Sequence, residues 1–166
     1  MQQTIWNKKE LKIMPSLKLA FNISVKVDTP IVVGQDEVNG RRQLIPILSG
    51  ELTGEGLHGT VLPGGVDSQV IRPNGVCELS ARYGVRMDDG SSFYIQNDGI
   101  RTVPPEYVPA VKNGEFIDPD LYYFCTHPVF EVYDRRLDWL NEKLFVCCAT
   151  RLPDQVILGY YTVEVK

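Results

Sequence analysis

The chain has 166 residues and a formal net charge of −4 at pH 7, with 43% hydrophobic and 23% charged residues. This length is typical of one domain with a single core, and the composition is that of a globular chain rather than a disordered one. The negative charge argues against nucleic acid as a partner, because phosphate binding depends on lysine and arginine.

No apolar run approaches the length that a bilayer requires, and the first residues lack the apolar segment of a secretory signal. We therefore expect a cytoplasmic protein with no membrane partner. The four cysteines, Cys77, Cys125, Cys147 and Cys148, show no CxxC spacing. We expect them to be reduced, small apolar residues, with Cys147 and Cys148 on opposite faces of one strand.

Residues 1–15 are expected to form an N-terminal arm ahead of a strand over 17–27, whose alternating apolar residues share one face. Further strands are predicted over 31–33, 44–48, 57–62, 68–71 and 76–87, with Pro46 marking an edge or a bulge. Asp88, Asp89 and Gly90 are typical of a tight hairpin turn, and a return strand is expected over 92–97.

A short helix is predicted over 104–111, followed by a strand over 121–133 with a bend at His127 and Pro128. Asp134 is a candidate N-cap for a helical turn that runs to Glu142, and strands over 144–150 and 155–165 complete the pattern. The pattern contains about eight to ten strands, one or two short helices and no linker. It predicts an all-β fold in one domain that spans residues 1–166. A sheet of this size avoids exposed edges by closing into an antiparallel β-barrel.

In the stretch from Gly40 to Pro73, six closely spaced glycines from Gly50 to Gly65 lie between short apolar runs, and this spacing indicates turns between strands. No helix follows these glycines and no GxxxxGK[ST] motif is present, which argues against a nucleotide cofactor. His58 and His127 are the only histidines, and neither belongs to a metal-ligand motif. We therefore expect neither a metal nor another cofactor.

Several runs resemble the family catalogued as domain of unknown function 3237. They are GRRQLIPILSG, GTVLPGGVDSQVIRPNG, SARYGVRMDDGSSFYIQNDGIR, YYFCTHPVFE and DWLNEKLFV, which follow in the family's order between Gly40 and Val146. The resemblance implies a compact antiparallel β-barrel that self-associates, with a dimer favoured, and it implies no particular reaction. Ser80 stands where the family pattern has an acidic residue, and Val66 and Ser68 replace an alanine and a tryptophan.

Polar residues on these runs are the candidates for a site. As catalytic residues we single out Arg42, Asp67, Arg82, Tyr123 and Glu131, and as ligand-binding residues Arg41, Gln69, Tyr94, Asn97, Arg101, Tyr122 and Trp139. An arginine could bind a carboxylate or oxyanion through its bidentate fork, and Asp67 or Glu131 could act as general acid or base. Tyr122 and Tyr123 project to opposite faces of a strand, so only one of them can reach a given ligand.

Three hypotheses follow. The first is a cofactor-independent isomerase, cyclase or lyase that acts on a small, partly apolar organic molecule inside the barrel. It requires Arg42, Arg82 and Glu131 to converge on one pocket. The second is a barrel that carries such a molecule unchanged, which predicts an apolar cavity with at most one charged group. The third is an oligomeric interaction protein in which the arginines form an interface.

Overall fold

The structure is a computed structural model that describes residues 14–165. Residues 1–13 of the expected N-terminal arm lie outside this range, and the first strand begins at Pro15. The strands are β1 (Pro15–Val27), β2 (Ile31–Asp36), β3 (Gly40–Gly54), β4 (Leu57–Val61), β5 (Gly65–Ile71), β6 (Cys77–Met87), β7 (Ser92–Thr102), β8 (Tyr123–Val132), β9 (Phe145–Arg151) and β10 (Gln155–Val165). The helical segments are η1 (Pro105–Tyr107), α1 (Val108–Lys112), η2 (Pro119–Leu121) and η3 (Arg135–Asn141).

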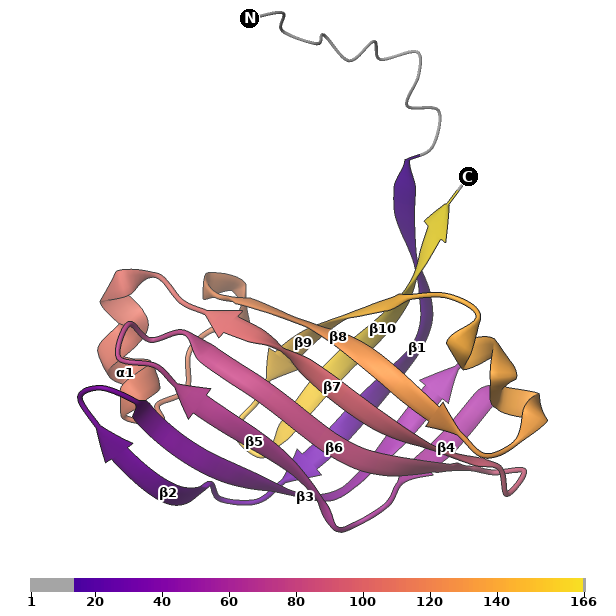
Figure 1. Ribbon diagram of the computed structural model, residues 1–166, viewed down its shortest axis with the longest axis horizontal. Coiled ribbons are helices and arrows are strands. Elements are labelled where there is room, and N and C mark those ends of the chain that lie inside the picture. The colour runs from indigo at the N-terminus through magenta and orange to yellow at the C-terminus, as the bar shows by residue number, and fades with distance from the viewer. Residues whose placement is uncertain (1–13, 166) are drawn as a thin grey trace, which may run out of the picture.

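All strand pairs are antiparallel, and pairing between β1 and β3 closes eight of the strands into a barrel (Figure 1). The first half of β3 pairs with β2 and β5, whereas its second half pairs with β1 and β4. The all-β barrel predicted from the sequence is thus confirmed. Beyond the barrel, the start of β1 and the end of β10 continue as a two-stranded ribbon.

The inner face follows the apolar alternation of the strands. Phe21, Ile23 and Val25 of β1 are almost fully buried, and the residues between them are more exposed. At the end of the barrel near η3, the interior is filled by an aromatic cluster that also includes Leu137 and Leu140 of η3. At the other end α1 packs its buried Val111 against a smaller cluster. Figure 1 shows α1 and the orange helix η3 at these opposite ends.

Two kinds of glycine occur in the stretch from Gly40 to Pro73. Gly56 and Gly64 have positive φ and lie in turns, as the sequence predicts. Gly50, Gly59 and Gly65 lie within strands, where a β-carbon would come within 3 Å of neighbouring atoms. The tight curvature of a small barrel brings backbones together at these positions, so the in-strand glycines mark close contacts rather than turns.

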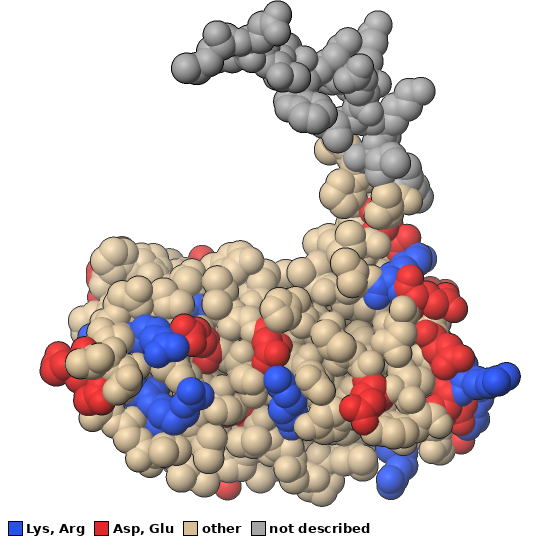
Figure 2. All heavy atoms as spheres, viewed as in Figure 1, with Lys and Arg blue, Asp and Glu red and all other residues tan. Residues whose placement is uncertain are grey.

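The outer face carries acidic and basic side chains side by side (Figure 2). Arg82 pairs with Asp98 at 2.8 Å, and Arg72 pairs with Glu78 at 2.7 Å. Exposed pairs of this kind contribute only about 0–1 kcal/mol each to stability. No helix within residues 14–165 is both long enough and apolar enough to cross a bilayer.

Gly99 on β7 gives a test of barrel curvature. A β-carbon there would lie 2.3 Å from the carbonyl oxygen of Cys125 on β8. Gly99→Ala should therefore lower the free energy of unfolding by about 2 kcal/mol or more, measured by urea denaturation. Gly34→Ala is the control, because nothing lies within 4 Å of its β-carbon position. Equal stability of the two variants would contradict this account of the closure.

Candidate functional site

A cavity of about 380 Å³ occupies the half of the barrel nearer to α1. Loop residues from the β1–β2 and β9–β10 connections border it, including Asp28, Pro30 and Pro153. Its wall combines apolar side chains with polar ones from β5, β6, β7, β8 and β9. Toward η3 the barrel is filled by the aromatic cluster, so the cavity and the packed core divide the interior between them.

Two tyrosines lie where the cavity meets the packed core. The hydroxyl groups of Tyr83 and Tyr160 are 2.7 Å apart, and the Asn97 amide donates to the Tyr160 hydroxyl at 3.4 Å. Burial raises the pKa of both tyrosines, which keeps their hydroxyl groups protonated. Tyr83 lines the cavity, and its hydroxyl group is held by the hydrogen bond to Tyr160.

An amide chain across β3 and β5 holds Asp67. Gln43 donates to Gln69 at 2.9 Å, and Gln69 donates to one carboxylate oxygen of Asp67 at 2.7 Å. The other oxygen accepts from the backbone N–H of Ser80 at 3.1 Å. Burial raises the pKa of Asp67 above its ordinary value of 3.8, although these hydrogen bonds oppose the shift. Asp67 is therefore a positioned carboxyl group that keeps its proton to a higher pH than an ordinary aspartate.

Two arginines face the same cavity. Arg101 is only 5% exposed, and its guanidinium carbon lies 6.0 Å from the centre of the Phe124 ring. Burial, and then the charge of Arg101, lower the pKa of Arg151. Within residues 14–165 neither guanidinium has a carboxylate within ion-pair distance, and neither donates a hydrogen bond. Asp67 on the wall of the same cavity is the carboxyl group whose charge interacts with both arginines, without a direct contact between them.

Two further wall residues have unused hydrogen-bonding capacity. The side-chain oxygens of Asn97 and Thr126 are buried and have no partner among residues 14–165. An unpaired buried polar atom costs about 1–3 kcal/mol, so such atoms are uncommon in purely structural positions. Both residues line the cavity, and both lie near the buried Cys147 thiol, where they oppose the rise in pKa that burial causes.

The structure brings four of the predicted site residues together at the cavity: Asp67, Gln69, Asn97 and Arg101. Tyr122 lies beside them, and its hydroxyl accepts a hydrogen bond from the backbone N–H of Arg151 at 2.8 Å. Arg41 is half-buried at the same end of the barrel and donates to the carbonyl of Lys112 at 3.4 Å.

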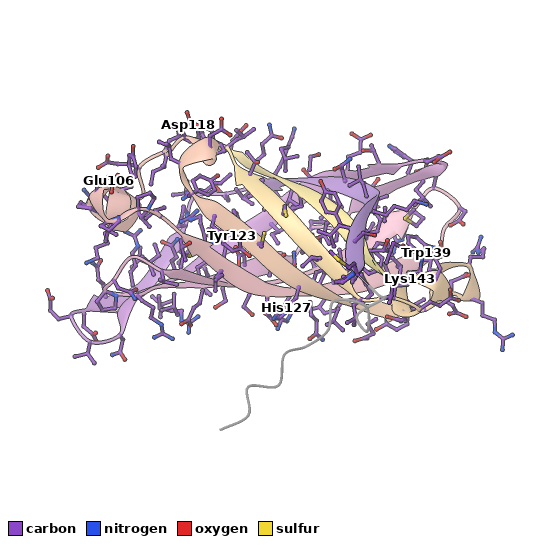
Figure 3. All side chains as sticks on the ribbon, turned by 90° about the horizontal axis from the view of Figure 1, so that it is seen from above. Glu106, Asp118, Tyr123, His127, Trp139 and Lys143 are labelled. Atoms are coloured by element: carbon purple, nitrogen blue, oxygen red, sulfur yellow. The ribbon has the colours of Figure 1, made fainter. Side chains whose placement is uncertain are left out.

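The other predicted residues lie elsewhere. Arg42 donates to Ser68 on the outer face, Arg82 pairs with Asp98, and Glu131 accepts from Tyr133. Tyr94 is the register partner of Glu131 on the neighbouring strand and faces the same outer side. Tyr123 is 55% exposed, and Trp139 lies at the η3 end of the barrel (Figure 3). Arg42, Arg82 and Glu131 therefore do not converge on one pocket, because each occupies an outward position of its strand.

Sequence reasoning missed Arg151, Tyr83, Thr126 and Gln43. Alternation along each strand contains the signal for three of them. Each lies an even number of residues from buried apolar residues of its strand and so faces the same side. Tyr83 is in phase with Leu79 and Val85, Thr126 is in phase with Phe124, and Arg151 is in phase with Cys147. Within residues 14–165, no three His, Cys, Asp or Glu side chains gather in a way that could hold a metal ion.

Residues 15–163 match the family model described as "Protein of unknown function (DUF3237)". The chain belongs to this family. A UPF0311 protein from Clostridium acetobutylicum is 57% identical over 144 residues, which are 87% of this chain and 91% of that protein. The DUF3237 resemblance inferred from the sequence is thereby confirmed.

Solved structures share the fold of this DUF3237 chain. A crystal structure of a protein with unknown function from Clostridium acetobutylicum has a TM-score of 0.88 and 53% identity, covering 91% of this chain and 98% of that one. A crystal structure of an enzyme from Penicillium herquei has a TM-score of 0.69 at 17% identity, covering 90% and 95%. This second likeness shows a common barrel fold.

The raised pKa of Asp67 predicts a stability effect with a definite sign. In the unfolded chain Asp67 loses its proton at a pKa of about 3.8, whereas in the folded protein it keeps the proton to a higher pH. The free energy of unfolding therefore falls as pH rises from the unfolded pKa to the folded pKa. Asp67→Asn removes this loss. The variant should be as stable as the parent protein or more stable at pH 7, measured by urea denaturation between pH 4 and about pH 8.

Asp98→Asn is the matched control. Arg82 on the outer face lowers the pKa of Asp98, so ionised Asp98 supports folding above its unfolded pKa. Its replacement should leave stability at neutral pH unchanged or reduced by up to about 1 kcal/mol. Clear destabilisation by Asp67→Asn at neutral pH, with no dependence on pH, would show that Asp67 has a purely structural role.

Proposed function

We propose that this protein is a cofactor-independent enzyme of the isomerase, cyclase or lyase kind, which binds a small, partly apolar organic acid in the barrel cavity and moves a proton within it. The observation that carries the proposal is the group of Asp67, Arg101 and Arg151 around one cavity, with no ion pair among them. The proposal takes its residues from the inner face, in place of Arg42, Arg82 and Glu131.

The arginines support an anionic ligand. Removing a guanidinium from water is unfavourable unless an anion or several acceptors replace the water. Arg101 has the Phe124 ring as its neighbour, and the nearby Arg151 adds a second positive charge. A carboxylate or phenolate would pair with the guanidinium fork. The apolar wall, which includes Ile45, Leu79 and Leu158, would contact the remainder of the molecule.

Asp67 supports proton transfer. A carboxyl group whose pKa is raised toward the working pH is a more effective general base than an ordinary aspartate. In the proposed step the C–H bond next to a carbonyl breaks and its proton passes to Asp67. The electron pair forms a C=C bond while the carbonyl oxygen becomes an enolate oxygen. Asp67 then returns the proton to another atom of the same molecule, so no oxidant or reductant is consumed.

Hydrogen-bond donors and cations stabilise the enolate formed in such a step. Arg101 and Arg151 provide positive charge, and Tyr83, which also lines the cavity, would provide a neutral donor when the Tyr160 hydroxyl donates to it. Bound with its anionic group at the arginines, a ligand would extend toward Asp67 and Tyr83. The barrel fold is compatible with catalysis, since the Penicillium herquei protein that shares it is an enzyme.

The main alternative is a barrel that carries a ligand unchanged. That hypothesis predicts an apolar cavity with at most one charged group, whereas five charged residues line this one: Asp28, Asp67, Arg101, Arg151 and Asp154. A carrier would also gain nothing from a carboxyl group with a raised pKa opposite cationic groups. The charge content of the cavity therefore favours catalysis over simple carriage.

Ligand charge can be tested with naphthoate and its neutral amide, using calorimetric titration. Naphthoate should bind more tightly than naphthamide, and Arg101→Gln should weaken naphthoate binding about 10- to 100-fold. Arg82→Gln is the control, because this arginine pairs with Asp98 on the outer face. Equal binding of acid and amide, or equal effects of the two substitutions, would refute an anion site in the cavity.

Proton transfer can be tested without knowledge of the natural substrate. Phenylpyruvate has a carboxylate, a ketone and acidic hydrogens beside it, and nuclear magnetic resonance in D₂O reports exchange of those hydrogens. The protein should accelerate exchange above the buffer rate, and Asp67→Asn should reduce the acceleration by about 10²–10⁴-fold. Asp98→Asn should retain it. Binding of phenylpyruvate without accelerated exchange would indicate the carrier function instead.

A further inference from the structure

Two cysteines face each other on the outer side of the barrel. Cys125 on β8 is the register partner of Cys148 on β9, and their sulfur atoms are 3.3 Å apart. Cys148 is exposed and Cys125 is half-buried. Their neighbours along the strands, Thr126 and Cys147, are buried and point inward, so the pair lies on the outer face of the barrel. The exposed Tyr123 lies on the same face (Figure 3).

The backbone permits this pair to form a disulfide. Directly opposed residues of antiparallel strands have α-carbons about 4.5–5.5 Å apart, within the range of about 4.4–6.8 Å that disulfides require. The two thiols are already in contact, so closure needs changes of side-chain rotamer rather than movement of a strand. The other two cysteines, Cys77 and Cys147, are fully buried and have no such partner within residues 14–165.

We propose that Cys125 and Cys148 form a surface dithiol site that reacts with low-molecular-weight disulfides such as oxidised glutathione. One thiolate attacks the glutathione disulfide, and a mixed disulfide forms as one glutathione leaves as a thiol. The second cysteine, as its thiolate, then attacks the protein sulfur and releases the other glutathione. The protein loses two protons and two electrons, and one glutathione disulfide becomes two thiols.

The reaction is expected to be slow and reversible. Partial removal of its sulfur from water, together with the hydrogen bond to Cys125, raises the pKa of Cys148 to about 11, so its thiol form predominates near neutral pH. The nearby Cys125 also raises the pKa of Tyr123. These surroundings resemble those of a thiol pair that oxidises over minutes to hours rather than those of a rapidly reacting catalytic cysteine.

Closure would connect β8 to β9 around η3. The segment between the two cysteines contributes Phe130, Leu137, Leu140 and Phe145 to the aromatic cluster. A crosslink across this segment restricts the unfolded chain and should raise the melting temperature by about 5–10 °C. Because both cysteines point away from the cavity, ligand binding there should change little.

The test uses the full chain incubated with oxidised glutathione, followed by thiol counting and mass spectrometry. Two of the four thiols should be lost, with no bound glutathione, and dithiothreitol should restore them. Trypsin can cut at Arg135, Arg136 and Lys143, which separates the two cysteines into different peptides. The peptides should remain joined before reduction.

Matched variants identify the partners, since Cys147 and Cys148 fall in the same tryptic peptide. Cys147→Ala should still form the crosslink, whereas Cys148→Ser should stop at a single glutathione on Cys125. The melting temperature of the oxidised parent protein gives a second measurement that needs no variant. Four unreacted thiols, a stable glutathione adduct on the parent protein, or crosslinks between chains would overturn the proposal.

Discussion

Closure of the sheet through the pairing of β1 with β3 is the constraint on which the rest of the structure depends. Once the strands form a ring, each residue of a strand faces either a confined interior or the solvent, and alternation leaves no intermediate choice. The interior must then be filled by side chains or left as a cavity. In this barrel both outcomes occur, one at each end.

The two halves use the interior differently. Near η3, stacked and edge-on aromatic rings such as Phe21 and Tyr160 fill the barrel, and their burial provides much of its stability. Near α1, the same inward positions carry Asp67, Gln69 and Arg101. Polar side chains in such positions reduce stability, and this reduction is characteristic of a site that binds a ligand.

Local patterns predicted most of the fold because strand alternation, Asp-Gly turns and capping residues are visible in the sequence. They predicted the site less well. Asn97 and Arg101 alternate in phase with the buried Phe93 and Ile95, but the strand predicted over 92–97 ended before Arg101, whereas β7 continues to Thr102. On β6 we chose the outward Arg82 as a site residue and overlooked the inward Tyr83. The choice rested on the charge of Arg82, whereas the apolar alternation along the strand shows which side chains face the barrel interior. The ion pair with Asp98, which explains Arg82, joins adjacent strands and cannot be inferred from one strand alone.

The packed end of the barrel also limits the routes by which a ligand could reach the cavity. Since the aromatic cluster fills one end and loop residues such as Pro30 and Pro153 border the other, the proposed ligand would enter and leave at the loop end. In the proposed reaction a new reactant would wait for the previous product to depart, and the two would compete for the same space. Such a blind chamber is suited to converting one molecule into one other molecule of similar size.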